Sequence, residues 1–181
     1  MKDMRKIFYY LLIILFLYGF SAANAQTDKR TIAMDVLKEA FQKEMTGNRD
    51  EAIKLVVKSL SIDPDLAQAN LVRAEFAVDY RDWETAKRYY QKGLVLIDQP
   101  DQPLSPESGI EITKSEVKGT SKCMLGLVYI MLSKNARDSG DDLLEYEYIL
   151  KAKKQINDGL KLDPIPSVRV MAEDIIKKYG D

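Results

Sequence analysis

Few side chains in this sequence are of the types that carry out catalysis. The chain contains no histidine and a single cysteine, Cys123, so histidine-assisted nucleophilic catalysis lacks its base and metal binding lacks its commonest ligand. Gly119 and Gly126 lie in a helical pattern without the lysine that a phosphate-binding loop needs. We therefore expect no enzymatic activity, no cofactor and no metal. We interpret Cys123 as a small buried apolar side chain.

A cluster of carboxylates between Asp138 and Asp142 is faintly similar to a calcium-binding loop. It lacks the alternating ligand spacing and the final glutamate of such a loop. We interpret the cluster as a solvated turn followed by a helix start, where acidic side chains face the positive end of the helix dipole.

The elements that position these side chains are helices, and one unit sets their pattern. The segment between Gly47 and Pro64 reads GNRDEAIKLVVKSLSIDP. Asn48 is placed to cap a helix, with Glu51 reaching back to the cap, and apolar residues then recur at helical spacing. The pattern returns 34 residues later, with Asp82 as the expected cap. Nearly all apolar positions follow the helical period, so we predict an all-α fold.

A 34-residue period with two helices per unit resembles the tetratricopeptide repeat (TPR) family. Gly47 matches the turn between the helices and Pro64 the end of the unit. In that family, small residues stand where the paired helices cross; here they are Ala40 and Ala52, then Ala74 and Ala86. The family's early tryptophan is missing from all three units.

The resemblance implies a right-handed solenoid of about three helical hairpins, at residues 31–64, 66–97 and 110–164, with a capping helix at 167–179. The third hairpin is longer than the pattern, because Ala152 lies 26 residues after Gly126 whereas Ala52 lies 12 after Ala40. We expect its first helix to end near Ser133 and a polar turn at 134–142. Residues 98–109 contain three of the six prolines and are expected to form a loop.

The N-terminal residues have the pattern of a secretory signal peptide. Basic residues precede the apolar run IFYYLLIILFLYGF at 7–20, and Ala23 and Ala25 give a cleavage pattern. We predict a signal peptide at 1–25 and a mature TPR-like domain at 26–181, in the periplasm of a Gram-negative bacterium or secreted. In the alternative, the segment stays uncleaved and anchors the chain to a membrane. No basic tract indicates a nucleic-acid partner.

These features favour a non-enzymatic scaffold that binds another protein or peptide through the concave face of its hairpins. By the resemblance, the partner-binding groove would be lined by Leu37, Phe41, Met45, Gln68, Leu71, Glu75, Val78 and Asp79. These residues favour an apolar segment with basic neighbours, and the family's Lys/Asn/Arg clamp for a carboxylate tail is absent. In a second interpretation, the same residues pack on one another and leave no groove. Other functions left open are a structural subunit of an envelope complex, and a small-ligand or glycan-binding protein with exposed tyrosines.

Overall fold

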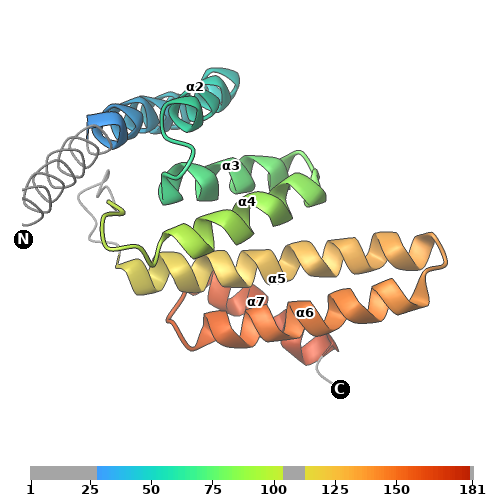
Figure 1. Ribbon diagram of the computed structural model, residues 1–181. Coiled ribbons are helices and arrows are strands. Elements are labelled where there is room, and N and C mark those ends of the chain that lie inside the picture. Colours follow the sequence, from blue (N-terminus) through green and yellow to red (C-terminus); the bar gives the residue numbers. More distant parts are fainter. Residues whose placement is uncertain (1–27, 104–112, 180–181) are drawn as a thin grey trace, which may run out of the picture.

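A computed structural model describes residues 28–103 and 113–179 of the chain, and every regular element in those ranges is a helix. The first helix covers residues 28–45. It is followed by α2 (Arg49–Ile62), α3 (Ala67–Asp79), α4 (Trp83–Leu96), α5 (Lys114–Asp138), α6 (Asp142–Leu160) and α7 (Pro166–Tyr179) (Figure 1). The all-α prediction is confirmed. The predicted signal peptide and the later part of the 98–109 loop lie outside the described residues.

The same turn joins the two helices of each hairpin. One residue with a positive φ ends the first helix, and these residues are Gly47 (78°), Arg81 (58°) and Gly140 (78°). Its N–H donates to the carbonyl three residues back, and the next N–H donates to the carbonyl five residues back, with N···O distances of 2.8–2.9 Å in all three turns. This is the Schellman arrangement that closes helix C-termini. The turn expected at Gly47 therefore recurs, with an arginine in the second copy.

The helices that follow these turns begin at polar residues, and two of the three use their side chains as caps. Asp82 accepts a hydrogen bond from the Thr85 N–H at 3.2 Å, as the sequence predicts. Asp141 accepts one from the Leu144 N–H at 3.0 Å. Asn48 occupies the cap position of α2, but its side chain makes no capping hydrogen bond. The predicted capping box at α2 is therefore wrong in its hydrogen bonding, although the helix begins there.

Small residues let the paired helices cross closely. The four alanines predicted for the first two crossings, Ala40, Ala52, Ala74 and Ala86, are each at most 2% exposed. In the third crossing, a Cβ added to Gly126 would lie only 2.4 Å from Ile156 Cγ1, so the space beside it is fully occupied. The close packing of α5 against α6 therefore requires glycine at this position.

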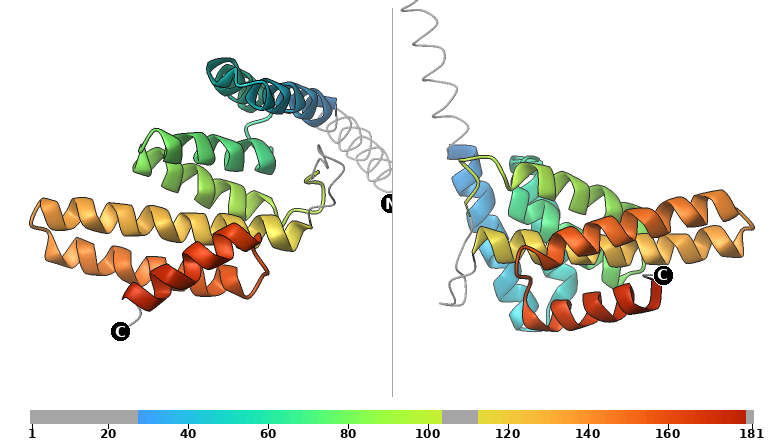
Figure 2. Two further views of the ribbon diagram at one scale, coloured as in Figure 1. Left: turned by 180° about the vertical axis from the view of Figure 1, so that it is seen from behind. Right: turned by 90° about the horizontal axis from the view of Figure 1, so that it is seen from below.

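The core is divided into three apolar clusters that follow the order of the chain. The first joins helix 28–45 and α2 to one side of α3; the second joins α3, α4 and α5; the third joins α5 and α6 to α7. Tyr90, Leu37 and Ile156 are among the largest fully buried side chains in these clusters. In Figure 1 the hairpins accordingly lie one above another, and Figure 2 shows α7 lying across the α5–α6 pair.

The α5–α6 hairpin projects beyond its neighbours (Figure 1). Gly140 lies 14 residues after Gly126 and 12 before Ala152, whereas Gly47 lies 7 after Ala40 and 5 before Ala52. Each arm of the third hairpin is thus longer by seven residues, close to two helical turns. The expected polar turn at 134–142 is shorter than predicted, because α5 continues to Asp138. Polar residues alone do not end a helix, and no glycine or proline interrupts this segment before Gly140.

A polar contact ties the loop after α4 back to the first hairpin. Arg30 Nε donates to Asp63 Oδ2 at 2.8 Å, and its Nη1 donates to the Asp101 carbonyl at 3.2 Å and pairs with the Asp101 carboxylate. The buried Gln102 side chain accepts from the Ala67 N–H at 2.8 Å and donates to the Asp65 carbonyl at 2.9 Å. Gln102 thus caps α3 from a distant part of the chain.

Candidate functional site

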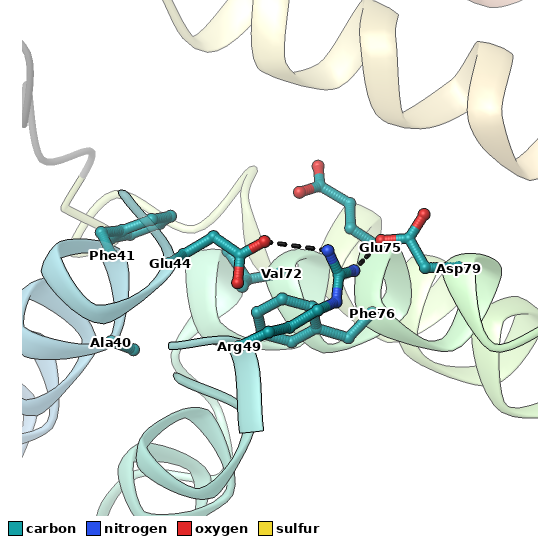
Figure 3. Close-up of a pocket in the computed structure, with 8 residues that line it drawn as sticks. All are labelled: Ala40, Phe41, Glu44, Arg49, Val72, Glu75, Phe76 and Asp79. Atoms are coloured by element: carbon teal, nitrogen blue, oxygen red, sulfur yellow. Dashed lines mark hydrogen bonds and ion pairs between the residues drawn. The ribbon is translucent and has the colours of Figure 1, made fainter. Parts of the chain in front are cut away.

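A pocket opens between helix 28–45 and α3, with a cavity volume of about 110 Å³. Its lining residues are Ala40, Phe41, Glu44, Arg49, Val72, Glu75, Phe76 and Asp79 (Figure 3). The volume is well below the roughly 300–1,000 Å³ of pockets that enclose small-molecule ligands. It is suited to one side chain rather than to a whole metabolite.

Three elements supply the lining. The last turns of helix 28–45 supply Ala40, Phe41 and Glu44 at helical spacing. The face of α3 supplies Val72, Glu75, Phe76 and Asp79, which are three or four residues apart and so lie along one side of the helix. Arg49, the first residue of α2, reaches into the pocket because the Gly47 turn places the start of α2 beside the end of helix 28–45.

Arg49 links the two walls of the pocket. Its Nη1 donates to Glu44 Oε1 at 2.9 Å, its Nη2 pairs with the Asp79 carboxylate, and its guanidinium lies 5.1 Å from the centre of the Phe76 ring. Partial desolvation acts to lower the pKa of Arg49, but the hydrogen bond and charge of Asp79, with the charge of Glu44, raise it overall. The guanidinium therefore stays charged and already serves two of the three carboxylates.

Glu75 is the carboxylate that Arg49 does not serve. Among the described residues, Glu75 forms no hydrogen bond and no ion pair, and Figure 3 shows its carboxyl group pointing away from Arg49. The surrounding protein removes bulk water from one side of the group, and this, with the charge of Asp79, raises the pKa of Glu75 to about 7. The side chain is exposed on its other side, so water moderates the desolvation. A cation placed beside Glu75 would relieve both effects.

Tyr90 lies behind this wall of the pocket. The side chain is fully buried, and its hydroxyl has no hydrogen-bond partner among the described residues. Burial, together with the charges of Glu75 and Asp79, raises the pKa of Tyr90 above its ordinary value. The phenol therefore remains protonated next to two acidic groups. The sequence places Tyr90 in the core, and its burial agrees with that prediction.

The structure brings only part of the predicted groove together. Phe41, Glu75 and Asp79 line the pocket. Leu37 and Leu71 are buried in the core, at 0% and 3% exposure. The remaining three lie outside the pocket lining: Met45 is 83% exposed at the end of its helix, Val78 is partly buried against the second cluster, and Gln68 is half-buried.

Arg49, Val72 and Phe76 belong to the pocket but were not among the groove positions that the sequence suggested. The resemblance considers only the first helix of each hairpin, whereas Arg49 starts a second helix. A signal for Arg49 was present, because a single cation directly follows a turn that joins two acid-bearing helices. Val72 and Phe76 look like core positions in the sequence, and each indeed has one side in the first apolar cluster.

Cys123 is fully buried between α5 and α6, as expected, and burial raises the pKa of its thiol to about 11. Within residues 28–103 and 113–179, no group of three or more His, Cys, Asp or Glu side chains is arranged to hold a metal ion. No helix in these ranges is both long enough and apolar enough to cross a membrane.

Comparisons of the chain with protein-family models, with curated proteins and with solved structures give no significant match. The functional interpretation therefore depends on the residues and their geometry alone.

Proposed function

We propose that this protein is a non-enzymatic, TPR-like scaffold that binds a segment of another protein in the pocket between helix 28–45 and α3. The segment presents a lysine or arginine side chain next to apolar residues. The single observation that carries this proposal is the unpaired Glu75 carboxylate beside a small aromatic pocket.

The repeat of the turn geometry supports the TPR-like architecture. The turns at Gly47 and Arg81 are 34 residues apart and use the same pair of hydrogen bonds. Identical turns, with small residues at each crossing, give successive hairpins the same internal geometry. This is the condition under which hairpins stack into a solenoid that offers its first helices to a partner.

The chemistry of the pocket supports a cationic, partly apolar ligand. Three carboxylates face one guanidinium, so the pocket carries an excess of negative charge. Phe41 and Phe76 offer ring faces, which attract cations as well as apolar groups. A basic side chain could pair with Glu75 while its methylene groups contact these rings.

The segment at 1–25 supports export, and we propose that the protein acts in the periplasm after cleavage at Ala25. The mass of the chain purified from the exporting cell tests this directly. Cleavage gives a chain that starts at Gln26, whereas the mass of the full chain would contradict it.

A random-peptide display selection against the purified protein tests the binding proposal. We expect the enriched peptides to combine Lys or Arg with adjacent apolar residues. Glu75→Gln should weaken their binding about tenfold, as expected for loss of one charge pair of roughly 1.4 kcal/mol. Glu39→Gln is the matched control, because Glu39 is exposed on the same helix as Phe41 and lies outside the pocket lining. Acidic enriched peptides, an absence of enrichment, or equal loss in both variants would contradict the proposal.

The pH dependence adds a second readout. Because the pKa of Glu75 is raised to about 7, a rise from pH 6 to pH 8 deprotonates the carboxyl and should strengthen binding of a lysine-containing peptide. The Glu75→Gln variant should show no such rise. Affinity that falls toward pH 8 in the wild type would count against a role for this carboxylate.

A further inference from the structure

Three large apolar side chains are exposed along one side of α6. Leu143 is 80% exposed, Tyr146 61% and Leu150 48%. They are spaced by three and four residues, so they share one face of the helix. We call Leu143, Tyr146 and Leu150 the outer stripe.

The outer stripe lies on the side of α6 that faces away from the rest of the fold. The buried residues of α6 are Ala152, Ile156 and Gly159. At 100° per residue, Leu150 points about 160° away from Ala152. The helix α7 covers the other half of the hairpin, around Cys123 and Ile156, and leaves the outer stripe uncovered. Single exposed apolar residues are ordinary, but a continuous apolar stripe on a helix indicates a contact surface.

The charges beside the outer stripe are arranged in two blocks. Asp142 and Glu147 flank its N-terminal part, and Lys153 and Lys154 follow its C-terminal end. Asp142, Lys153 and Lys154 make no hydrogen bond or ion pair with any described residue. Acids at one end and unpaired lysines at the other make α6 complementary to an antiparallel copy of itself. A parallel copy would instead place like charges together.

An antiparallel pair also aligns the apolar residues. If Tyr146 lies opposite Leu150 of a second copy, two-fold symmetry places the first copy's Leu150 opposite the second copy's Tyr146. On one flank Asp142 then approaches Lys153 of the second copy, and on the other Glu147 approaches its Lys154. Each contact is made twice because the interface is isologous.

We propose that the outer stripe on α6 is a self-association surface that binds a second copy of this chain in an antiparallel, two-fold symmetric pair. The interface consists of one helix from each copy and is smaller than the surface that stable dimers bury. The pair is therefore reversible and depends on protein concentration. It places two copies of the pocket on one particle, which strengthens binding to a partner that carries two matching segments.

Sedimentation velocity of the protein as the cell produces it tests the proposal. We expect monomer at about 1 μM and growing dimer toward about 200 μM, the range suited to an interface of this size. Leu150→Glu and Tyr146→Glu should each shift the midpoint at least tenfold upward. Val95→Glu is the control, because Val95 is 71% exposed on α4 and lies away from α6. Unchanged circular dichroism excludes loss of folding as the cause.

Charge reversal tests the antiparallel arrangement itself. Lys153→Glu with Lys154→Glu should weaken the dimer, and adding Asp142→Lys with Glu147→Lys should restore it, because both pairs are then reversed. Monomer at every concentration would overturn the proposal, as would a dimer that Leu150→Glu leaves intact. A dimer that the four-residue reversal fails to restore would overturn the antiparallel geometry. None of these measurements uses a peptide ligand, so they are independent of the proposed pocket.

Discussion

At the scale of single residues, the three inter-helix turns differ in one position. Gly47 and Gly140 adopt a positive φ, which glycine tolerates without steric penalty, whereas Arg81 adopts the same conformation with a side chain. Among the described residues, Arg81 makes no side-chain hydrogen bond or ion pair that would compensate. The second turn is therefore strained relative to the other two.

Arg81→Gly should stabilise the protein relative to Arg81→Ala by about 0.5–1 kcal/mol, because glycine relieves the strain while alanine keeps it. Urea denaturation at 25 °C measures the difference. The matched change at an unstrained turn, Gly140→Ala, should destabilise by about 1 kcal/mol. An Arg81→Gly variant that is less stable than Arg81→Ala would show that this turn carries no strain.

At the scale of elements, the crossing of α5 and α6 depends on the absence of side-chain atoms. Gly126 faces Ile156 and the carbonyl oxygen of Ala152, and Gly159 faces Cys123 and the carbonyl oxygen of Gly119. The added Cβ of an alanine would lie 2.6 Å from Cys123 Sγ at Gly159. Real Cβ atoms do not approach other atoms so closely, so the helices would have to separate.

Gly126→Ala should destabilise the protein by about 1–3 kcal/mol, since overpacking outweighs the gain in helix propensity of about 1 kcal/mol. Its cost should fall when Ile156→Ala is already present, because the atom nearest to the new Cβ is then removed. A double-mutant cycle in urea measures this coupling. Equal cost in both backgrounds would show that the contact with Ile156 does not limit the crossing.

The sequence predicted those features that follow from local rules. Helical spacing, the turn at Gly47 and the four crossing alanines are local patterns, and each has its expected place. The length of α5 was underestimated, because a polar segment such as 134–138 stays helical when its neighbouring helix supports it. The pocket was predicted only in part, since Arg49 belongs to it through the geometry of a turn and not through its repeat position.

At the scale of the whole molecule, Arg30 joins parts of the chain that the repeat pattern leaves separate. It contacts Asp63 at the end of α2 and Asp101 in the loop after α4. Asp63 is 2% exposed, and Arg30 is 9% exposed in its side chain. Desolvation acts to lower the pKa of Arg30, but hydrogen bonds and charges of Asp63 and Asp101 raise it overall.

Arg30→Ala should destabilise the protein by about 3 kcal/mol, because it leaves the buried Asp63 carboxylate without a cation. Arg30→Ala combined with Asp63→Asn should recover part of the loss, since the buried group is then neutral. Lys38→Ala serves as the control, because its pair with Asp35 is exposed and should contribute less than about 1 kcal/mol. Thermal unfolding measures all three variants. A loss after Arg30→Ala no larger than that after Lys38→Ala would exclude a joining role.

The seven extra residues in each arm of the α5–α6 hairpin also separate two properties of the fold. Seven residues are nearly two full turns, so the facing sides of the helices keep their phase while each arm lengthens by about 10 Å. The reach of the hairpin can therefore change in steps of seven without rotating the crossing at Gly126. In this chain the distance to which the outer stripe extends is a variable of its own, independent of how the hairpins stack.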